Sequence, residues 1–322
     1  MDKYNVIKLI GEGTYGVVSF GFQKSTGRPV AIKKIKKILI KDATDDGVSF
    51  SAIREIKALQ EFKHTNIVEL VDVFAYKSNV YLVFELMSWD LQHIIEDKSV
   101  ILKAADIKSY MLMLLQGVEA CHKNWILHRD LKPNNLLCSS ETGEMKLADF
   151  GLARQYGDPH KVFSPQAVTI FYRAPELLFG AKSYGPSVDM WSVGCIFAEL
   201  MLRTPYLPGN SEIDQLKKIF SALGTPNETI WPGVTSLPNY IQFTEFPATP
   251  FNQLFTAASS DALDLLAKML TFNPASRCTA TEALAHPYFS NQPKPTSPKD
   301  LPRPANAAVY NLDPNQPPVP KK

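Results

Sequence analysis

The sequence predicts an α+β protein of two lobes, in which a β-rich N-lobe carries one helix and the C-lobe is mostly helical. Two observations support this division. Short β-forming runs dominate the first part of the chain, and apolar residues at helical spacing dominate the part after Met87. A third is compositional, because nine prolines occur from Pro293 to the end of the 322-residue chain. We therefore expect an N-lobe over residues 1–86, a C-lobe over 88–290, and an extended or disordered Pro-rich tail over 291–322.

Five runs rich in β-branched and aromatic residues predict strands in the N-lobe, over residues 4–10, 17–22, 28–35, 67–74 and 80–85. In the third run, apolar Val30 and Ile32 alternate with Ala31 and Lys33, as expected for a strand with one buried face. Between the third and fourth runs, apolar residues recur at helical spacing, namely Ile53, Ile56, Leu59 and Phe62. The N-lobe is therefore expected to be a small sheet with a single helix.

Helical patterns dominate the C-lobe. Asp106 is expected to cap a long helix whose apolar face includes Tyr110, Leu114 and Val118. Further helices are expected over roughly 188–202, 211–223, 261–270 and 280–286.

The composition is that of an ordinary globular protein, with 45% hydrophobic and 20% charged residues. The 34 basic and 32 acidic residues nearly cancel, so direct binding to nucleic acid or to a membrane is not expected. No apolar run approaches the roughly 20 residues of a membrane helix, and the first residues lack the apolar core of a signal peptide. The four cysteines form no CxxC pair, which excludes an evident zinc site or disulfide framework. We expect a soluble intracellular protein.

Gly11, Gly13 and Gly16 fit the pattern G-x-G-x-x-G. The same spacing opens dinucleotide-binding helices, but here the residues after Gly16 favour a strand. A glycine hairpin between two strands can offer backbone N–H groups to a triphosphate, although a plain hairpin turn is the alternative. Lys33 follows on the third strand, where a buried ammonium needs a partner. Nucleotide phosphates and the carboxylate of Glu55, on the predicted helix, would provide one.

Two further blocks carry the chemistry: His128-Arg129-Asp130-Leu131-Lys132-Pro133-Asn134-Asn135 and Asp149-Phe150-Gly151. Asp130 can accept the proton of an attacking hydroxyl, and Lys132 can meet charge on a transferring phosphate. Asn135 and Asp149 supply the oxygen ligands that Mg²⁺ prefers. Phosphoryl transfer depends mainly on positioning and charge neutralisation, and these side chains provide both.

Several residues are expected to support this site. Glu176 is expected to pair with Arg277, and Asp189 is expected to orient the loop that contains Arg129. Four more are interpreted as core packing that links the lobes rather than as ligands: His128, Phe150, Leu59 and Leu70.

These motifs, in this order, resemble those of the protein kinase superfamily over residues 4 to about 290. The resemblance implies the bilobal protein kinase fold and transfer of the γ-phosphoryl group of ATP to Ser or Thr, with ATP and Mg²⁺ as cofactors. Residues 51–57 (SAIREIK) resemble the cyclin-contacting helix of cyclin-dependent kinases. Residues 110–122, 126–137 and 174–209 are similar to the class of CDK-activating kinases associated with the transcription factor TFIIH.

The resemblance also implies roles at matching positions. Phe84 is expected to be the gatekeeper, Glu85 to Met87 the hinge that binds adenine, and Asp90 a residue near the ribose. The nucleotide-binding set implied in this way is Ile10, Gly11, Gly13, Gly16, Val18, Ala31, Lys33, Phe84, Glu85, Met87, Asp90, Asn135, Leu137 and Asp149.

Regulation is implied at two places. Ser164 occupies the position of the activating phosphosite, where its phosphate would gather Arg54, Arg129 and Arg154. The alternative is that these arginines bind nearby carboxylates only. Thr14 and Tyr15 match the inhibitory phosphosites of cell-cycle kinases, although both side chains could simply pack in the glycine loop.

Some positions depart from the family pattern. The activating residue is Ser rather than Thr and precedes Pro165, so Ser164 is itself a Ser-Pro site. Ile170 stands where the family has Arg or Leu, which puts in doubt any arginine-dependent reading of substrate there.

We therefore expect a cyclin-dependent Ser/Thr kinase of the TFIIH class, with a cyclin on the helix over residues 51–62 and an assembly factor as a further partner. Expected substrates are Ser/Thr-Pro sites, such as the repeats of the RNA polymerase II C-terminal domain and the activation loops of other cyclin-dependent kinases. The nucleus is implied by resemblance, with the cytoplasm also possible for this class. Two alternatives stay open: a cell-cycle kinase regulated at Thr14 and Tyr15, and a catalytically silent scaffold in a transcription complex.

Overall fold

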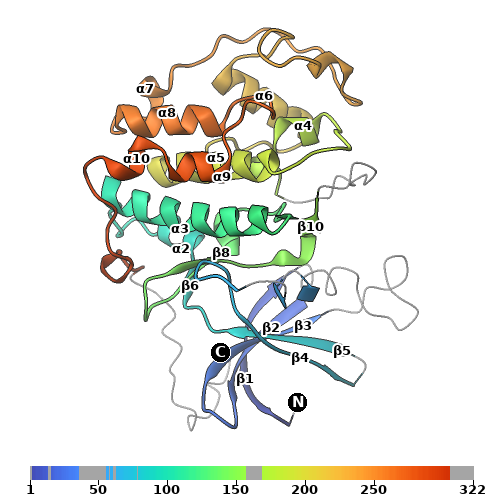
Figure 1. Cartoon of the computed structure of the whole chain (residues 1–322), viewed down its shortest axis with the longest axis vertical. Helices are drawn as coiled ribbons and strands as arrows, with labels where there is room; N and C mark the ends of the chain where they lie inside the picture. The colour runs from blue at the N-terminus through green and yellow to red at the C-terminus, as the bar shows by residue number, and fades with distance from the viewer. Residues whose placement is uncertain are drawn as a thin grey trace.

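The computed structural model describes residues 2–13, 16–35, 56–57, 59–60, 63–77, 79–156 and 169–304. Within these residues it has the two predicted lobes, with the sheet of the N-lobe at one end and the helices of the C-lobe at the other (Figure 1).

The N-lobe is built on a five-stranded antiparallel sheet of order β1-β2-β3-β5-β4. Its strands match the five predicted runs: β1 Tyr4–Gly13, β2 Gly16–Gln23, β3 Pro29–Ile35, β4 Leu70–Tyr76 and β5 Asn79–Glu85. The predicted alternation in β3 is confirmed, because Val30 and Ile32 are buried whereas Ala31 and Lys33 are half-buried. Of the predicted helix, residues 56–57 and 59–60 are described as helical, and Leu59 is buried.

The C-lobe contains the predicted helices with small shifts at their ends. Its longer helices are α3 Ala104–Lys123, α5 Ser187–Leu202, α6 Glu212–Leu223 and α8 Ser260–Met269. Shorter ones are α2 Leu91–Glu96, α4 Pro175–Leu178, α7 Phe251–Leu254, α9 Ala280–Leu284 and α10 Pro287–Ser290. Short 3-10 turns lie at Pro133–Asn135, Phe150–Leu152, Ile170–Tyr172, Val234–Ser236 and Pro298–Asp300.

Five short strands lie near the junction of the lobes. β6 Trp89–Asp90, β8 Leu136–Cys138 and β9 Met145–Leu147 form a three-stranded sheet of order β6-β8-β9. β7 Ile126–Leu127 pairs with β10 Arg154–Gln155. These two small sheets flank the segment over residues 128–135, so they fix both ends of the loop that carries the predicted catalytic residues.

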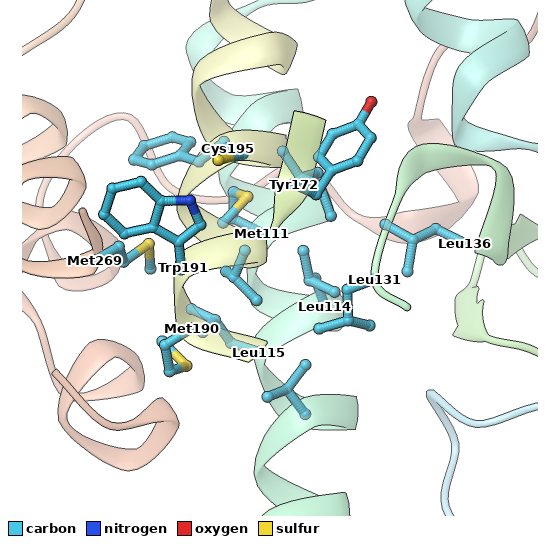
Figure 2. Packing of buried hydrophobic residues seen from close by; sticks show 14 of the residues in the cluster. Met111, Leu114, Leu115, Leu131, Leu136, Tyr172, Met190, Trp191, Cys195 and Met269 are labelled. Atoms are coloured by element: carbon cyan, nitrogen blue, oxygen red, sulfur yellow. The ribbon is translucent and has the colours of Figure 1, made fainter. Parts of the chain in front are cut away.

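Helix α5 forms the centre of the C-lobe. Its residues from Val188 to Leu200 are all buried, which is the pattern of a helix surrounded by others. Figure 2 shows Met190, Trp191 and Cys195 of α5 packed with Met111 and Leu114 of α3. The same apolar cluster continues through Phe150 to Leu82 and Phe84 of the N-lobe sheet, so one core joins the two lobes.

The long helix begins three residues earlier than predicted, because its N-cap is Lys103. Asp106 is not its cap but stands in its first turn, after the start at Ala104. The Asp106 carboxylate accepts a hydrogen bond of 2.9 Å from the backbone N–H of Lys103, which satisfies a donor that the helix leaves free.

The prediction for the start of the tail is wrong in one respect. Residues 291–304 hold only the 3-10 turn at Pro298–Asp300, but they pack against the C-lobe, with Leu301 in the core at 6% exposure. The Pro-rich composition misled because proline removes backbone donors without preventing side-chain docking. Residues 305–322 of the predicted tail lie outside the described part of the chain. No helix among the described residues is long and apolar enough to cross a membrane.

Candidate active site

The loop between β7 and β8 brings three predicted catalytic residues together. Lys132 Nζ lies 3.1 Å from Asp130 Oδ2. Asn135 Nδ2 donates to the same oxygen at 3.0 Å and to the backbone carbonyl of Asp130 at 2.7 Å. The other carboxylate oxygen, Asp130 Oδ1, is buried without a hydrogen-bond partner in the described part of the molecule. The loop therefore holds one carboxylate oxygen in place and leaves the second available to accept a proton or hydrogen bond.

The surroundings make Asp130 more basic than a free aspartate. Burial raises the pKa of its carboxyl, and the positive charge and hydrogen bond of Lys132 oppose this shift without cancelling it. Burial disfavours the charged form because the carboxylate loses contact with water. The raised pKa suits a general base, which must bind a proton in the transition state.

Lys33 and Asp149 link the N-lobe to the C-lobe. Lys33 Nζ, on β3, lies 3.1 Å from Asp149 Oδ1, although 116 residues separate them in sequence. Burial alone would raise the pKa of Asp149, but the charge and hydrogen bond of Lys33, with His128 and Lys132, lower it overall. Asp149 is therefore held as a carboxylate. The predicted partner of Lys33, Glu55, lies outside the described residues.

The segments that carry Asn135 and Asp149 are joined directly. The backbone N–H of Ala148 donates to the carbonyl of Asn135 at 2.9 Å. The His128 Nε2 atom lies 3.0 Å from the carbonyl oxygen of Ala148, and its ring packs edge-on against Phe150 with centroids 4.8 Å apart. His128 and Phe150 are both buried, which confirms the interpretation of these side chains as packing.

Asp189 supports the loop that contains Arg129, as predicted. Its carboxylate accepts from the backbone N–H groups of His128 at 2.9 Å and Arg129 at 2.8 Å, and Oδ2 lies 2.9 Å from His122 Nε2. Burial would raise the pKa of Asp189, but the hydrogen bond and charge of His122 and the other donors lower it overall. Arg129 has a φ of +69°, a strained conformation for a non-glycine residue, and these bonds stabilise it.

The predicted pair of Glu176 and Arg277 is confirmed. Arg277 donates to both carboxylate oxygens of Glu176, at 2.7 and 3.0 Å, and the Arg277 side chain is fully buried. This pair fastens α4, which ends the segment after Asp149, to the far side of the C-lobe.

The glycine-rich segment is a hairpin between two strands, as the sequence favoured. Gly13 and Gly16 pair across its end, with β1 before and β2 after. Gly16 cannot be replaced without a shift, because a Cβ there would lie 2.4 Å from the backbone oxygen of Lys34. A helix does not follow, so the geometry differs from that of a dinucleotide-binding turn.

The strand registers bring expected nucleotide-binding residues into neighbouring pairs. Val18 lies opposite Lys33, and Ala31 lies opposite Phe84, across three adjacent strands. Asp90 lies opposite Leu137 in the small sheet of the C-lobe. The remaining members, Ile10, Gly11, Glu85 and Met87, lie on β1, at the end of β5 and immediately after it.

Two features near the hinge escaped the sequence reasoning. Glu85 accepts from Lys146 Nζ at 3.0 and 2.9 Å through its two oxygens, and its Oε1 also accepts from the backbone N–H of Glu69 at 2.7 Å. Lys146 belongs to the C-lobe strand β9, so this side chain bridges the two lobes at Glu85. Asp90 Oδ1 accepts from the backbone N–H of His93 at 3.0 Å, and His93 Nδ1 lies 2.7 Å from the same oxygen. A helix-cap pattern in the sequence could have predicted the role of Asp90. No pattern in the sequence predicts the contact between Glu85 and Lys146.

A pocket adjoins the catalytic loop and was also missed. Its lining includes Asp130 itself and residues from the segment before α4 and from α5, among them Leu152, Tyr172, Ala174, Leu177 and Val188. Polar and charged residues complete the lining, among them Arg129, Arg173 and Ser192.

Of the predicted regulatory residues, the structure describes Arg129 and Arg154. Burial raises the pKa of Tyr184, and the positive charges of both arginines oppose this shift. The Arg129 guanidinium lies 5.5 Å from the centre of the Tyr184 ring. The others, Arg54, Ser164, Thr14 and Tyr15, lie outside the described residues.

Comparison with known proteins places the chain in a family. Residues 4–289 match the protein kinase domain. The chain is 75% identical to cyclin-dependent kinase 7 of Dictyostelium discoideum over 94% of its length and 84% of that protein's. It is 51% identical to the serine/threonine-protein kinase KIN28 of Saccharomyces cerevisiae, over 93% of the chain and 97% of the relative.

Among solved structures, the chain matches one from the CAK complex of Chaetomium thermophilum bound to ATP-γ-S. The TM-score is 0.86 at 45% identity, over 93% of this chain and 94% of that one. The chain therefore belongs to the protein kinase family and, within it, to the ATP-dependent, cyclin-dependent Ser/Thr kinases of the CDK-activating, transcriptional type.

Proposed function

We propose that this kinase phosphorylates Ser or Thr residues that precede proline, in the repeats of the RNA polymerase II C-terminal domain and in the activation loops of other cyclin-dependent kinases. The observation that carries the proposal is the arrangement of Asp130, Lys132 and Asn135 beside a pocket lined in part by the apolar side chains of Leu152, Ala174 and Leu177. An acceptor hydroxyl at Asp130 Oδ1 would place the following residue near this pocket. A proline ring, which is apolar and has no N–H to satisfy, suits such a lining.

In the proposed reaction, Asp130 Oδ1 accepts the proton of the substrate hydroxyl as the oxygen attacks the γ-phosphorus of ATP. The bond from that phosphorus to the bridging oxygen breaks, and ADP leaves. Lys132, which already contacts Asp130 Oδ2, stabilises the charge that builds on the transferring phosphoryl group. Lys33 contacts the other phosphates and Asp149 keeps it in place. The hinge, Glu85 to Met87, holds the adenine through its backbone, and Asp90 binds the ribose.

The site also fits a magnesium ion. Asn135 uses its amide nitrogen to hold the catalytic loop, which leaves its carbonyl oxygen for a cation. Asp149 is held ionised and offers a second hard oxygen. No group of three or more His, Cys, Asp or Glu side chains able to hold a metal occurs in the described residues, and Mg²⁺ characteristically uses few protein ligands together with phosphates. When bound, Mg²⁺ would neutralise charge on the ATP phosphates.

The proposed partners are a cyclin on the helix over residues 51–62 and an assembly factor. In the described part of this helix, Leu59 is buried in the core whereas Lys57 and Gln60 are exposed. One face is thus anchored and another is accessible to a partner that could bring Glu55 to Lys33. The relatives' names and the CAK complex support both partners, and association with transcription supports a nuclear location.

Activation is proposed to depend on the attraction between a phosphate on Ser164 and nearby arginines. A phosphate on Ser164 would be dianionic near neutral pH and would draw Arg54, Arg129 and Arg154 together. Support comes from the two arginines that the structure describes, because the positive charges of both oppose the rise in the pKa of the same residue, Tyr184.

The test is phosphate incorporation by the purified chain, with and without a co-expressed cyclin, into a Tyr-Ser-Pro-Thr-Ser-Pro-Ser repeat peptide and a kinase activation-loop peptide. We expect cyclin-dependent labelling of both, with a rate about 10²–10⁴ lower for Asp130→Asn. Labelling of neither peptide, with ATP still bound, would favour the cell-cycle kinase or the scaffold and refute the proposed substrates.

A further inference from the structure

The segment over residues 291–304, here named the strap, is fastened to the C-lobe at several points. Lys108 Nζ of α3 donates to the carbonyl of Asn291 at 3.0 Å. Thr296 donates twice to the first turn of α3, from its backbone N–H to the Ala105 carbonyl at 3.0 Å and from its hydroxyl to Asp106 Oδ1 at 2.6 Å. Figure 1 shows this segment leaving α10 and running beside one end of α3.

One buried apolar side chain and one close backbone contact hold the second half of the strap in place. Leu301 is 6% exposed and belongs to the main core. The carbonyl of Pro298 packs against Gly143, where a Cβ atom would lie 1.7 Å from it. Gly143 has a φ of +71°, so the turn between β8 and β9 uses glycine both for its backbone conformation and for this close approach.

Ser297 lies between these two groups of anchors and is different from both. It is exposed, and no hydrogen bond of its hydroxyl is found among the described residues. It directly precedes Pro298, and its backbone is extended, with φ −57° and ψ 136°. A Ser-Pro dipeptide with a free hydroxyl is the acceptor chemistry proposed above for this enzyme class.

The described part of the chain also has three Thr-Pro dipeptides, but none of them lies on the strap. Thr225 is engaged through its hydroxyl, which donates to the Thr244 carbonyl at 3.0 Å. Thr204 and Thr249 are exposed, but they lie inside the C-lobe sequence, between helices. Ser297 alone among these four follows the last core helix and has a strap anchor on each side.

We propose that Ser297 is a phosphorylation site for a proline-directed Ser/Thr kinase, that strap docking limits access to it, and that the phosphate prevents the strap from docking again. The choice of kinase rests on the proposed function, because a second copy of this enzyme has the required specificity. In the reaction, the Ser297 oxygen bonds to the γ-phosphorus of ATP, the bond from that phosphorus to the bridging oxygen breaks, and ADP leaves. The hydroxyl proton passes to the catalytic carboxylate of the kinase.

Docking restricts access because a kinase must surround the residues next to the acceptor. Pro298 is half-buried, its carbonyl faces Gly143, and Thr296 is bonded to Asp106. The strap must therefore open before Ser297-Pro298 can enter another active site. Opening is a local event, since the strap follows the last core helix and only Leu301 and Pro304 of its residues are buried.

The phosphate acts on redocking through charge. It adds about −1.5 to −2 charges near neutral pH. The adjacent residue Thr296 docks on the carboxylate of Asp106, so redocking would bring the new negative charge close to that carboxylate. Lys299 and Lys294 are the basic residues nearest in sequence, and both are exposed, where their charges are screened by water.

The experiment uses the full chain with Asp130→Asn as the substrate, so that it cannot label itself. Two kinases are added in separate arms: the cyclin-bound complex of the unaltered chain, and a purified cell-cycle cyclin-dependent kinase. Mass spectrometry follows phosphate at Ser297 over time. We expect labelling at Ser297 that is lost in Ser297→Ala, with none at the exposed, proline-free site Ser290.

The role of docking is tested with Leu301→Ala, which loosens the strap. Leu254→Ala is the matched control, because Leu254 is 46% exposed and far from the strap in the sequence. Labelling follows the population of open strap when opening is fast, so we expect Leu301→Ala to raise the initial rate on the order of tenfold. The control should leave the rate unchanged. Equal rates in all three substrates would refute the part played by docking.

Absence of phosphate at Ser297 in both the parent and Leu301→Ala, in both arms, would overturn the proposal if the Ser-Pro repeat peptide is labelled in parallel. If only the cell-cycle kinase labels Ser297 and the chain's own complex labels no peptide, the proposed function fails while this inference stands.

The effect of the phosphate is tested by hydrogen exchange. The Thr296 N–H is protected by its bond to Ala105, and we expect its exchange to rise about tenfold after labelling. Unchanged protection at stoichiometric labelling would show that the phosphate leaves the strap docked.

Discussion

The buried pair of Arg277 and Glu176 allows a quantitative test of how the C-lobe is held together. Arg277 donates all five of its N–H groups: two to Glu176, and one each to the carbonyls of Thr271, Ser187 and Phe272. The change Arg277→Met keeps most of the apolar stem but leaves the carboxylate buried without its counter-charge. Breaking a buried pair in this way costs about 3–5 kcal/mol.

The expected change in melting temperature follows from the size of the lobe. For about 200 residues with an unfolding entropy of roughly 2.1 cal/mol/K per residue, 4 kcal/mol corresponds to a fall of about 10 °C. Differential scanning fluorimetry or calorimetry of the purified chain measures it directly. Glu176→Gln added to Arg277→Met should recover about 2 kcal/mol, because the buried charge is then gone.

Lys268→Met provides the control. Lys268 forms a surface pair with Asp264, and the two side chains are 49% and 56% exposed. Such a pair contributes about 0–1 kcal/mol, so the melting temperature should fall by no more than about 2 °C. If Arg277→Met lowers the melting temperature no more than Lys268→Met does, the reasoning about burial is refuted.

Three further predictions concern the active site. Asp130→Asn should stabilise the chain by about 1 kcal/mol at pH 7.5, because the raised folded pKa of Asp130 means that its charge opposes folding. This gain is present above the folded pKa and disappears as pH falls below it; a pH-independent gain would contradict the assignment. Asp189→Asn should instead lower stability at neutral pH, by about 2 kcal/mol. Its lowered folded pKa provides stability that is present above the unfolded pKa and lost as pH falls through the folded one, so the melting temperatures of parent and variant should converge in acid. Lys146→Met should raise the KM for ATP about three- to tenfold and leave the KM for peptide unchanged, since it frees Glu85 of the proposed hinge. The control is Lys123→Met, which removes the ion pair of the exposed Lys123 with Glu119. Equal effects of the two changes would sink the prediction.

The sequence predicted the elements whose signal is local. The strands follow from runs of β-forming residues, and α5 follows from an apolar stretch that is buried on all sides. The pairing of Glu176 with Arg277 and the support of the Arg129 loop by Asp189 were also predicted, because fixed motifs carry these residues.

What could not be predicted depends on contacts without a local pattern. Lys33 contacts Asp149 at a separation of 116 residues, and Glu85 contacts Lys146 at a separation of 61. Both contacts depend on how the two lobes pack together, which the periodicity of the sequence does not predict. The strap was assigned to a loose tail because its prolines outweighed one leucine, Leu301, whose burial depends on a groove formed by distant residues. The position of Asp106 inside the first turn was missed because a capping aspartate and an aspartate two residues into the helix give the same sequence signal.

The bonds from Asp189 to the catalytic loop also set an order of events during synthesis. The backbone of Arg129 keeps its left-handed conformation through a carboxylate sixty residues later in the chain. While the ribosome is still adding those sixty residues, the segment from His128 to Asn135 has left or is leaving the exit tunnel without that support. During this time the hydrogen bonds that stabilise the left-handed conformation of Arg129 are missing. A chain that ends before α5 therefore contains the His128–Asn135 segment but lacks the carboxylate that supports the backbone of His128 and Arg129.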